Sequence, residues 1–218
     1  TPLPTNYGRI VEYTFPDVKP AYDHFSVTGW QSATELMKIA TRDILTKFEK
    51  ILDVSFIEGT EPIATNVITI ARTDQANTAG LSFFPNNHFE IGMDVFIANG
   101  YANPQFVDEF LTNYDYEVLV HELGHALGLK HPFEAYGAST VVLSHYEDKT
   151  VNTAMSYTED PATFDGTFRS LDWMALTKFY GVNDSYNAGD DNYSFSSSGG
   201  VFIIDGAGID KISAKNRK

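Results

Sequence analysis

Residues 121–131 read HELGHALGLKH, and three of the six histidines of this 218-residue chain fall within this stretch. On a helix, positions four apart lie on the same face, so His121 and His125 can direct two imidazoles at one ion. Gly128 stands where that helix should end, because glycine tolerates the positive φ at which the chain reverses. His131 can then swing back and complete a three-histidine zinc site, which leaves a fourth position open for water.

Glu122 adjoins the first of these histidines and should reach a water molecule at the metal. Zinc can lower the pKa of such a water from about 15.7 to near 7. A neighbouring carboxylate can take the released proton and deliver it to a leaving amine. A lone histidine is usually a core or surface residue, but here five positions match together. The stretch therefore predicts zinc-dependent peptide hydrolysis with Glu122 as the general base.

Further along the chain, residues 152–157 read NTAMSY and show no helical period. The pattern His-Glu-x-x-His-x-x-Gly-x-x-His is that of the metzincin metallopeptidases, which also require a methionine-containing turn below the zinc. Met155 would form the hydrophobic floor under the three imidazoles. Its alternative interpretation is an ordinary core methionine.

Within the metzincins, the chain resembles the serralysin family of bacterial secreted proteases. Pro132 follows the third histidine as in that family, residues 155–157 match its Met-Ser-Tyr turn, and residues 171–181 resemble the helix after that turn. The Gly/Asp-rich tail resembles the start of the family's calcium-binding β-roll. The resemblance implies an α+β fold: an α/β-layered metzincin catalytic domain, with a mixed sheet and long helices, followed by a short β-roll-like tail.

The resemblance also implies a role for Tyr157, two places after the methionine. In serralysins and the related astacins, this tyrosine is a switchable zinc ligand that moves away to hydrogen-bond the transition-state oxyanion. The alternative is a packed aromatic ring with a satisfied hydroxyl. The family binds its substrate as an extended strand along an exposed sheet edge, for which residues 80–95 are the candidate here.

The tail contains the stretch DGAGIDKIS at residues 205–213, which nearly fits the nonapeptide of calcium-binding parallel β-rolls. A single repeat cannot bury its apolar face alone, so either the protein continues past residue 218 or the repeat docks on the catalytic domain. In serralysins, the loop after the last catalytic helix and the first such turn share a calcium ion. The matching positions here are Asn187, Gly189, Asp190, Asp191, Asp205, Ala207 and Asp210. An ordinary solvated acidic turn is the alternative.

The rest of the chain is expected to form the strands and helices of the catalytic domain. We predict strands at residues 10–15, 54–57, 66–71, 81–84 and 89–96, and helices at residues 29–52, 114–127 and 171–180, the last capped by Ser170. The first helix carries an apolar stripe, formed by Ala33, Met37, Ala40, Ile44, Phe48 and Ile51. A composition shift predicts two domains: residues 1–184 as the catalytic domain and residues 185–218 as the calcium-binding segment.

Composition excludes several classes of protein. The chain has no cysteine, which rules out disulfide scaffolds and thiolate metal sites, and its net charge of −14 argues against a nucleic-acid partner. No apolar stretch approaches the ~20 residues that span a bilayer. The start lacks the features of a signal peptide and an initiator Met, so we interpret the chain as processed or truncated.

The expected function is a secreted, extracellular zinc metalloendopeptidase with one catalytic Zn²⁺, structural Ca²⁺ and extended protein or peptide substrates. The expected oligomeric state is a monomer, and a protein inhibitor is a further candidate partner. Two alternatives remain open. One is a calcium-dependent binding or adhesion module with a relic zinc site, although Glu122 is intact. The other is a zinc hydrolase that acts on a non-peptide substrate.

Overall fold

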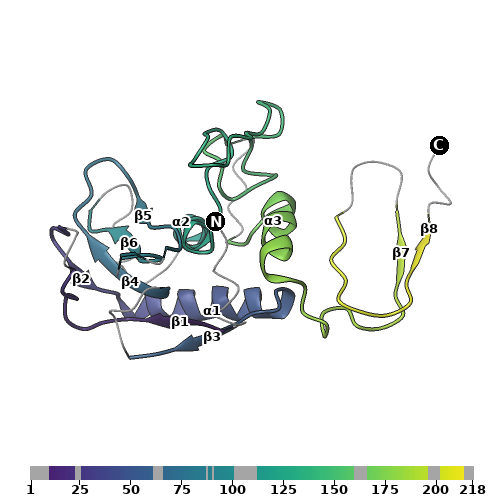
Figure 1. The fold of residues 1–218 in the computed structure, drawn as a ribbon, viewed down its shortest axis with the longest axis horizontal. Helices are drawn as coiled ribbons and strands as arrows, with labels where there is room; N and C mark the ends of the chain where they lie inside the picture. The colour runs from purple at the N-terminus through teal and green to yellow at the C-terminus, as the bar shows by residue number, and fades with distance from the viewer. Residues whose placement is uncertain are drawn as a thin grey trace.

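The computed structural model describes residues 10–22, 26–60, 66–86, 88–89, 91–100, 112–159, 166–195 and 202–213. Within these residues, a mixed sheet with one long helix comes first, two further helices follow, and a pair of short strands ends the described chain (Figure 1). This arrangement is compatible with the predicted α+β catalytic domain. The β-roll character of the tail stays a prediction.

The main sheet is mixed, and its order places one antiparallel strand at an edge. Along the sheet the order is β3 (Ser55–Glu58), β1 (Ile10–Thr14), β4 (Val67–Thr73), β6 (Val95–Ala98) and β5 (Gly80–Ser82), and β2 (Gln31–Ser32) pairs with β4. Strands β3, β1, β4 and β6 are parallel, whereas β5 and β2 are antiparallel to their neighbours. Among the described residues, β5 pairs only with β6 and leaves its other side open.

Four of the five predicted strands are confirmed to within a few residues, but the prediction for residues 89–96 is wrong in its first part. Residues 91–93 form a turn, in which Met93 has a φ of +73°. The side-chain oxygen of Asn86 accepts hydrogen bonds from the backbone of His88 and Phe89, which favours a turn over a strand. Strand β6 therefore starts only at Val95.

Helix α1 (Glu35–Ile51) is shorter than the predicted 29–52 because its first turn is fixed by a cap. Thr34 accepts a hydrogen bond from the backbone of Met37 at 3.2 Å, and the preceding residues pair with β4 instead. The stripe is confirmed in its centre, where Met37, Ala40, Ile44 and Phe48 are buried. Ala33 is buried ahead of the helix, and Ile51 is half-buried at its end.

Helices α2 (Asn113–Ala126) and α3 (Ser170–Tyr180) complete the core. Helix α2 contacts α1 on one side and strands β5 and β6 on another. Phe48 of α1 stacks on Phe168 at 4.5 Å between ring centroids and meets Trp173 of α3 edge-on at 5.7 Å. The N-cap of α3 is Arg169 rather than the predicted Ser170, and Gly181 ends the helix, with a φ of +84°.

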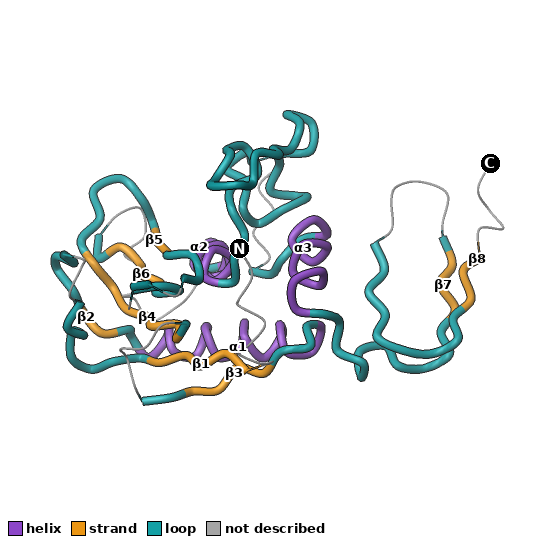
Figure 2. Tube along the Cα trace, viewed as in Figure 1, coloured by secondary structure: helices purple, strands orange, loops and turns teal. Residues whose placement is uncertain are grey.

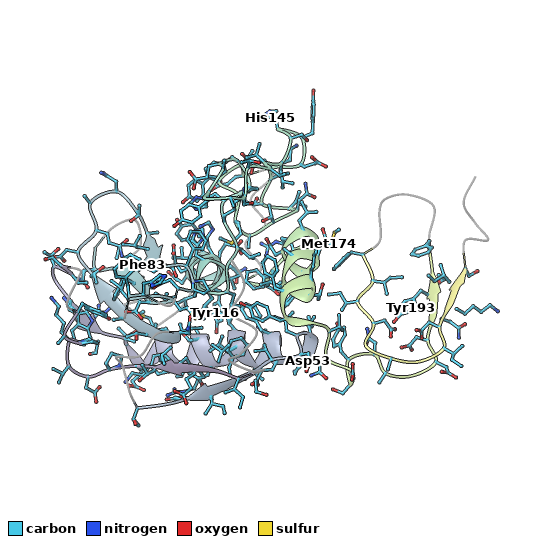
Figure 3. The ribbon with its side chains drawn as sticks, viewed as in Figure 1. Asp53, Phe83, Tyr116, His145, Met174 and Tyr193 are labelled. Atoms are coloured by element: carbon cyan, nitrogen blue, oxygen red, sulfur yellow. The ribbon has the colours of Figure 1, made fainter. Side chains whose placement is uncertain are left out.

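Between α2 and α3 the described chain forms turns and loops (Figure 2). These loops project from the body of the molecule, with His145 at their tip (Figure 3). They start directly after the histidine helix, so they form one wall of the region beside it.

The tail lies beyond α3, at the end of the molecule away from the main sheet (Figures 1 and 2). Strands β7 (Asn192–Ser194) and β8 (Lys211–Ser213) form a parallel pair. Asn183 is still tied to α1, since its side chain donates to the carbonyl of Glu49 at 2.8 Å, and Ile204 packs against the main core. The boundary near residue 184 and the two predicted domains stay predictions, and parts of both ranges fall outside the described residues.

Candidate active site

Helix α2 presents the two helical histidines from a rigid, buried position. Its start is a capping box, in which Thr112 accepts from the backbone of Asp115 and the Asp115 carboxylate accepts from the backbone of Thr112 at 2.6 Å. His121 and His125 are each only 8% exposed. The predicted reversal is confirmed at Gly128, whose φ is +99°.

The three imidazoles converge on one point. The Nε2 atom of His131 lies 3.2 Å from Nε2 of His121 and 3.1 Å from Nε2 of His125. Each opposite ring nitrogen, Nδ1, faces an oxygen that can only accept: the Ala154 carbonyl at 2.8 Å for His121 and the Leu129 carbonyl at 2.7 Å for His125. The Nδ1 atoms therefore carry the hydrogens, and the Nε2 lone pairs point at one another.

This donor set fits a zinc ion. Burial lowers the pKa of His121 to about 4 and that of His125 to about 3, so both rings are neutral ligands at neutral pH. Three lone pairs that converge within about 3 Å repel one another unless a cation lies between them. Nitrogen ligands in this number suit zinc and leave a position free for water or substrate.

Glu122 is buried beside the histidines and lines a cavity of about 290 Å³ together with His121 and Tyr157. Burial raises the pKa of Glu122 to about 8. Strand β5 comes close at this point. A Cβ atom on Gly80 would lie 2.5 Å from a Glu122 carboxylate oxygen, so Gly80 leaves the room that this side chain occupies.

Met155 lies under the histidine helix, and its role as the floor of the site stays a prediction. It is 2% exposed, and a Cβ atom on Gly124 would lie 2.5 Å from its sulfur. The turn that carries Met155 is bound to α3: the Asp172 carboxylate accepts hydrogen bonds from the Thr153 hydroxyl at 2.5 Å and from the Ala154 backbone at 2.7 Å. Since the Ala154 carbonyl accepts from His121, the turn connects α3 to the first histidine.

Tyr157 lies at the mouth of the site, 65% exposed. Its hydroxyl donates to Nε2 of His131 at 2.9 Å, and its ring stacks on that of His121 at 5.5 Å between centroids. The predicted switch residue is therefore within reach of the point where the imidazoles converge. Burial and the nearby Glu122 and Glu134 carboxylates raise the pKa of Tyr157, so its hydroxyl keeps its proton at neutral pH.

Of the described residues in the predicted sheet edge at 80–95, only those of β5 form an edge strand. Residues 91–93 form a turn, and Val95 begins β6 inside the sheet. The short strand β5 contacts α2, and Phe84, just beyond it, meets His125 edge-on at 5.5 Å between ring centroids. The open edge thus runs directly past the histidine site.

Three of the four aspartates predicted to bind calcium lie close together. Carboxylate oxygens of Asp191, Asp205 and Asp210 lie within 4.8 Å of one another. The Asn187 amide instead donates to the carbonyl of Ile204 at 3.0 Å, and Asp190 accepts from the backbone of Ile209 at 2.8 Å. The other two predicted positions lie beside this cluster: Ala207 donates its backbone N–H to Asp205, and Gly208 packs against the carbonyl of Gly189.

The sequence pattern did not reveal the roles of Gly80, Glu134 and Asp172 in the site. Gly80 and Asp172 act through contacts with residues far away in the chain, which no local spacing reveals. Glu134 stands three residues after His131 and accepts from its Nδ1 at 2.7 Å, so a carboxylate at this spacing was the available signal.

Comparison with known proteins agrees with this geometry. Residues 64–167 match the family model of reprolysin-like metallopeptidases of family M12B. The serralysin of Photorhabdus luminescens is 26% identical over 223 aligned residues, which cover 86% of this chain and 41% of that protein. The serralysin of Proteus mirabilis is 28% identical over 88% of this chain and 44% of its own length. The chain therefore spans less than half the length of these relatives.

The fold, the three histidines and the matched family model agree on the class: residues 64–167 are similar to zinc-dependent metallopeptidases of the metzincin type. Within that class, the chain is similar to the serralysins over most of its length. In the described part of the chain, no helix has the length and apolar character needed to cross a bilayer.

Proposed function

We propose that this chain is the catalytic part of a secreted zinc endopeptidase that cleaves extended protein substrates. The observation that carries this proposal is the convergence of three imidazole Nε2 atoms beside a buried carboxylic acid and an open sheet edge. His121, His125 and His131 would hold the zinc ion, and the support for secretion is the resemblance to the serralysins.

A zinc ion held there would polarise the scissile carbonyl and make water a stronger acid. Glu122 takes the proton from the attacking water and passes it to the leaving amine. Burial raises the pKa of Glu122, and the positive charge of a zinc ion beside it would lower it again, which suits a group that must both accept and release a proton near neutral pH. Tyr157 donates its hydroxyl hydrogen to the oxyanion that develops on the carbonyl.

The substrate backbone would pair with β5. In this antiparallel ladder, Ala79 and Phe83 form hydrogen bonds with the next strand, because Ala98 donates to the Ala79 carbonyl and Phe83 donates to the Asp94 carbonyl. Backbone groups alternate in direction along a strand, so those of Gly80 and Ser82 face the open edge. Backbone pairing of this kind accepts many sequences, as a broad endopeptidase requires.

The position of the cavity indicates which substrate residue it takes. It is lined by residues 77–80, at the start of β5, whereas Phe84 and His125 meet beyond the end of that strand. A substrate strand antiparallel to β5 runs from the Phe84 end towards the Ala79 end. The cavity beside Glu122 would therefore hold the side chain that follows the scissile bond.

Calcium binding by the tail belongs to the same proposal. The cluster of Asp191, Asp205 and Asp210 supplies the negative charge that calcium prefers, and nearby carbonyls would complete its six to eight oxygen ligands. Backbone oxygens of Gly189 and Ala207, with Asn187 and Asp190, are the remaining candidates. Calcium would join the loop after α3 to the β8 side of the tail.

The test is cleavage of casein by the intact chain and by its Glu122→Ala variant, in calcium and at equal zinc content. The intact chain should cleave, and loss of the general base should reduce the rate by about 10²–10⁴-fold. Glu35→Ala is a matched control, because Glu35 is an exposed α1 residue that pairs with Lys38. If the intact chain cleaves nothing, a binding module with a relic zinc site is favoured instead. Equal cleavage by both chains would exclude Glu122 as the base.

A further inference from the structure

The third histidine differs from the other two in how it is held. His121 and His125 lie on a buried helix and bind backbone carbonyls, which no substitution can remove. His131 lies on the loop after Gly128, and its Nδ1 donates to a side chain, the Glu134 carboxylate, at 2.7 Å. Of the three ligands, His131 alone therefore has an orientation that depends on another side chain.

The surroundings of His131 are built to place Glu134 there. Lys130 donates from its ammonium group to the backbone carbonyl of Glu134 at 2.7 Å and to that of His131 at 3.2 Å, which closes the loop into a tight turn. Phe133 stacks on the imidazole, with 5.0 Å between ring centroids and 10° between ring planes. Stacking on Phe133 thus fixes the plane of the His131 imidazole, and the hydrogen bond to Glu134 fixes the rotation of the ring within that plane.

We propose that Glu134 is a positioning residue that orients the third zinc ligand and strengthens zinc binding by its negative charge. This inference rests on the proposed zinc site. A carboxylate that accepts from Nδ1 keeps the hydrogen on that nitrogen, leaves the Nε2 lone pair free for the metal and makes the imidazole a better donor. A backbone carbonyl also keeps the hydrogen on Nδ1 and leaves the Nε2 lone pair free, but it carries no charge that would make the imidazole a better donor.

Charge balance argues for the same role. Three neutral imidazoles leave both positive charges of a zinc ion uncompensated. Glu122 offsets one of these charges when it is ionised, and Glu134, which is hydrogen-bonded to a ligand, offsets the other. Because the Glu134 side chain is 54% exposed, its charge is screened in part by water. Its main effect is therefore expected through the hydrogen bond to His131.

The test measures zinc affinity rather than cleavage. Metal-free protein is titrated with zinc against a competing chelator, for the intact chain and for the variants Glu134→Ala, Glu134→Gln and Glu134→Asp. We expect Glu134→Ala to weaken zinc binding about 10- to 100-fold. Glu134→Gln should weaken it less, since its amide oxygen still accepts a hydrogen bond, and Glu134→Asp should restore part of the loss.

A matched control is Glu147→Gln, which removes a carboxylate from the same group of loops. Glu147 bonds to the Ser144 hydroxyl at 2.7 Å and contacts no histidine in the described chain. Its zinc affinity should equal that of the intact chain. The visible spectrum of the cobalt-substituted protein adds a readout of ligand geometry, which should change in Glu134→Ala and stay unchanged in Glu147→Gln.

Two results would overturn the role of Glu134: unchanged zinc affinity in both Glu134→Ala and Glu134→Gln, or an equal loss in Glu147→Gln. If Glu134→Ala does not fold, Glu134→Leu, which keeps the bulk of the side chain but cannot accept a hydrogen bond, decides the question in its place. These results are read as affinities, so they are independent of whether casein is cleaved. A chain whose zinc affinity depends on Glu134 but which cleaves nothing would contradict the proposed function and leave this inference standing.

Discussion

Tyr157 illustrates how one hydroxyl can act at two places in the same site. It donates to Nε2 of His131 in this structure, and the site needs a donor for the oxyanion once substrate binds. We predict that Tyr157→Phe lowers kcat by about 10²-fold, because a donor to a developing negative charge is lost. Zinc content should stay unchanged, since three imidazoles remain. Steady-state kinetics beside metal analysis checks this, and equal turnover would remove Tyr157 from the mechanism.

Asp94 is a buried acid outside the zinc site. Its carboxyl group accepts from the Tyr22 hydroxyl at 2.5 Å, and burial raises its pKa from 3.8 to about 7. Between these two values the unfolded chain has lost the proton while the folded chain keeps it. The unfolded state then binds fewer protons, so this group makes the free energy of unfolding fall as pH rises from about 4 to about 7.

The variant Asp94→Asn should lose that pH dependence, because an amide does not titrate. As the pH rises across this window, the free energy of unfolding of the variant should increase relative to that of the intact chain by up to about 1.4 kcal/mol per pH unit. Urea unfolding of both chains at pH 5 and pH 7.5 measures the difference. Equal changes in the free energy of unfolding of the two proteins between these pH values would mean that Asp94 ionises in the folded state as it does in the unfolded one.

At the scale of elements, the Met155 turn joins two helices that are far apart in sequence. Asp172, in the first turn of α3, accepts from Thr153, Ala154 and the backbone of Arg169, and the Ala154 carbonyl in turn accepts from His121. Burial raises the pKa of Asp172 despite these hydrogen bonds. The carboxylate is therefore a buried connection between α3 and the zinc helix.

We predict that Asp172→Asn destabilises the fold by about 1–3 kcal/mol, because one amide NH₂ would face backbone donors and leave a buried group unsatisfied. Urea unfolding measures this loss. Asp43→Asn, on the exposed face of α1, is the control, since its pair with Lys47 is half exposed and worth little. Equal stability of Asp172→Asn and the intact chain would show that these hydrogen bonds add nothing net.

Local patterns predicted most elements and the convergence of the three histidines, because helical period, capping and histidine spacing act over a few residues. Patterns failed where tertiary contacts decide. The chain at residues 31–32 pairs with β4 rather than extending α1, and residues 91–93 turn because Asn86 fixes the preceding backbone. Asp172 gave no functional signal, since its partners lie 18 and 19 residues away.

At the scale of the whole molecule, the tail stands apart from the sheet and presents three carboxylates close together. Figure 3 shows Tyr193 in this tail, on the far side of α3 from Phe83. Carboxylates within 4.8 Å repel one another without a cation. We therefore predict that millimolar calcium raises the Tm, and that the double variant Asp205→Asn and Asp210→Asn loses this rise. Calorimetry with calcium and with chelator checks this, and an unchanged Tm in the intact chain would contradict a calcium site.

The measurement that tests the central claim most directly is a zinc titration of the metal-free chain, with casein cleavage followed at each step in excess calcium. The three-histidine site predicts activity that rises in proportion to added zinc and stops rising at one zinc per chain. Zinc bound at one per chain without cleavage, or full cleavage by the metal-free chain, would contradict the account.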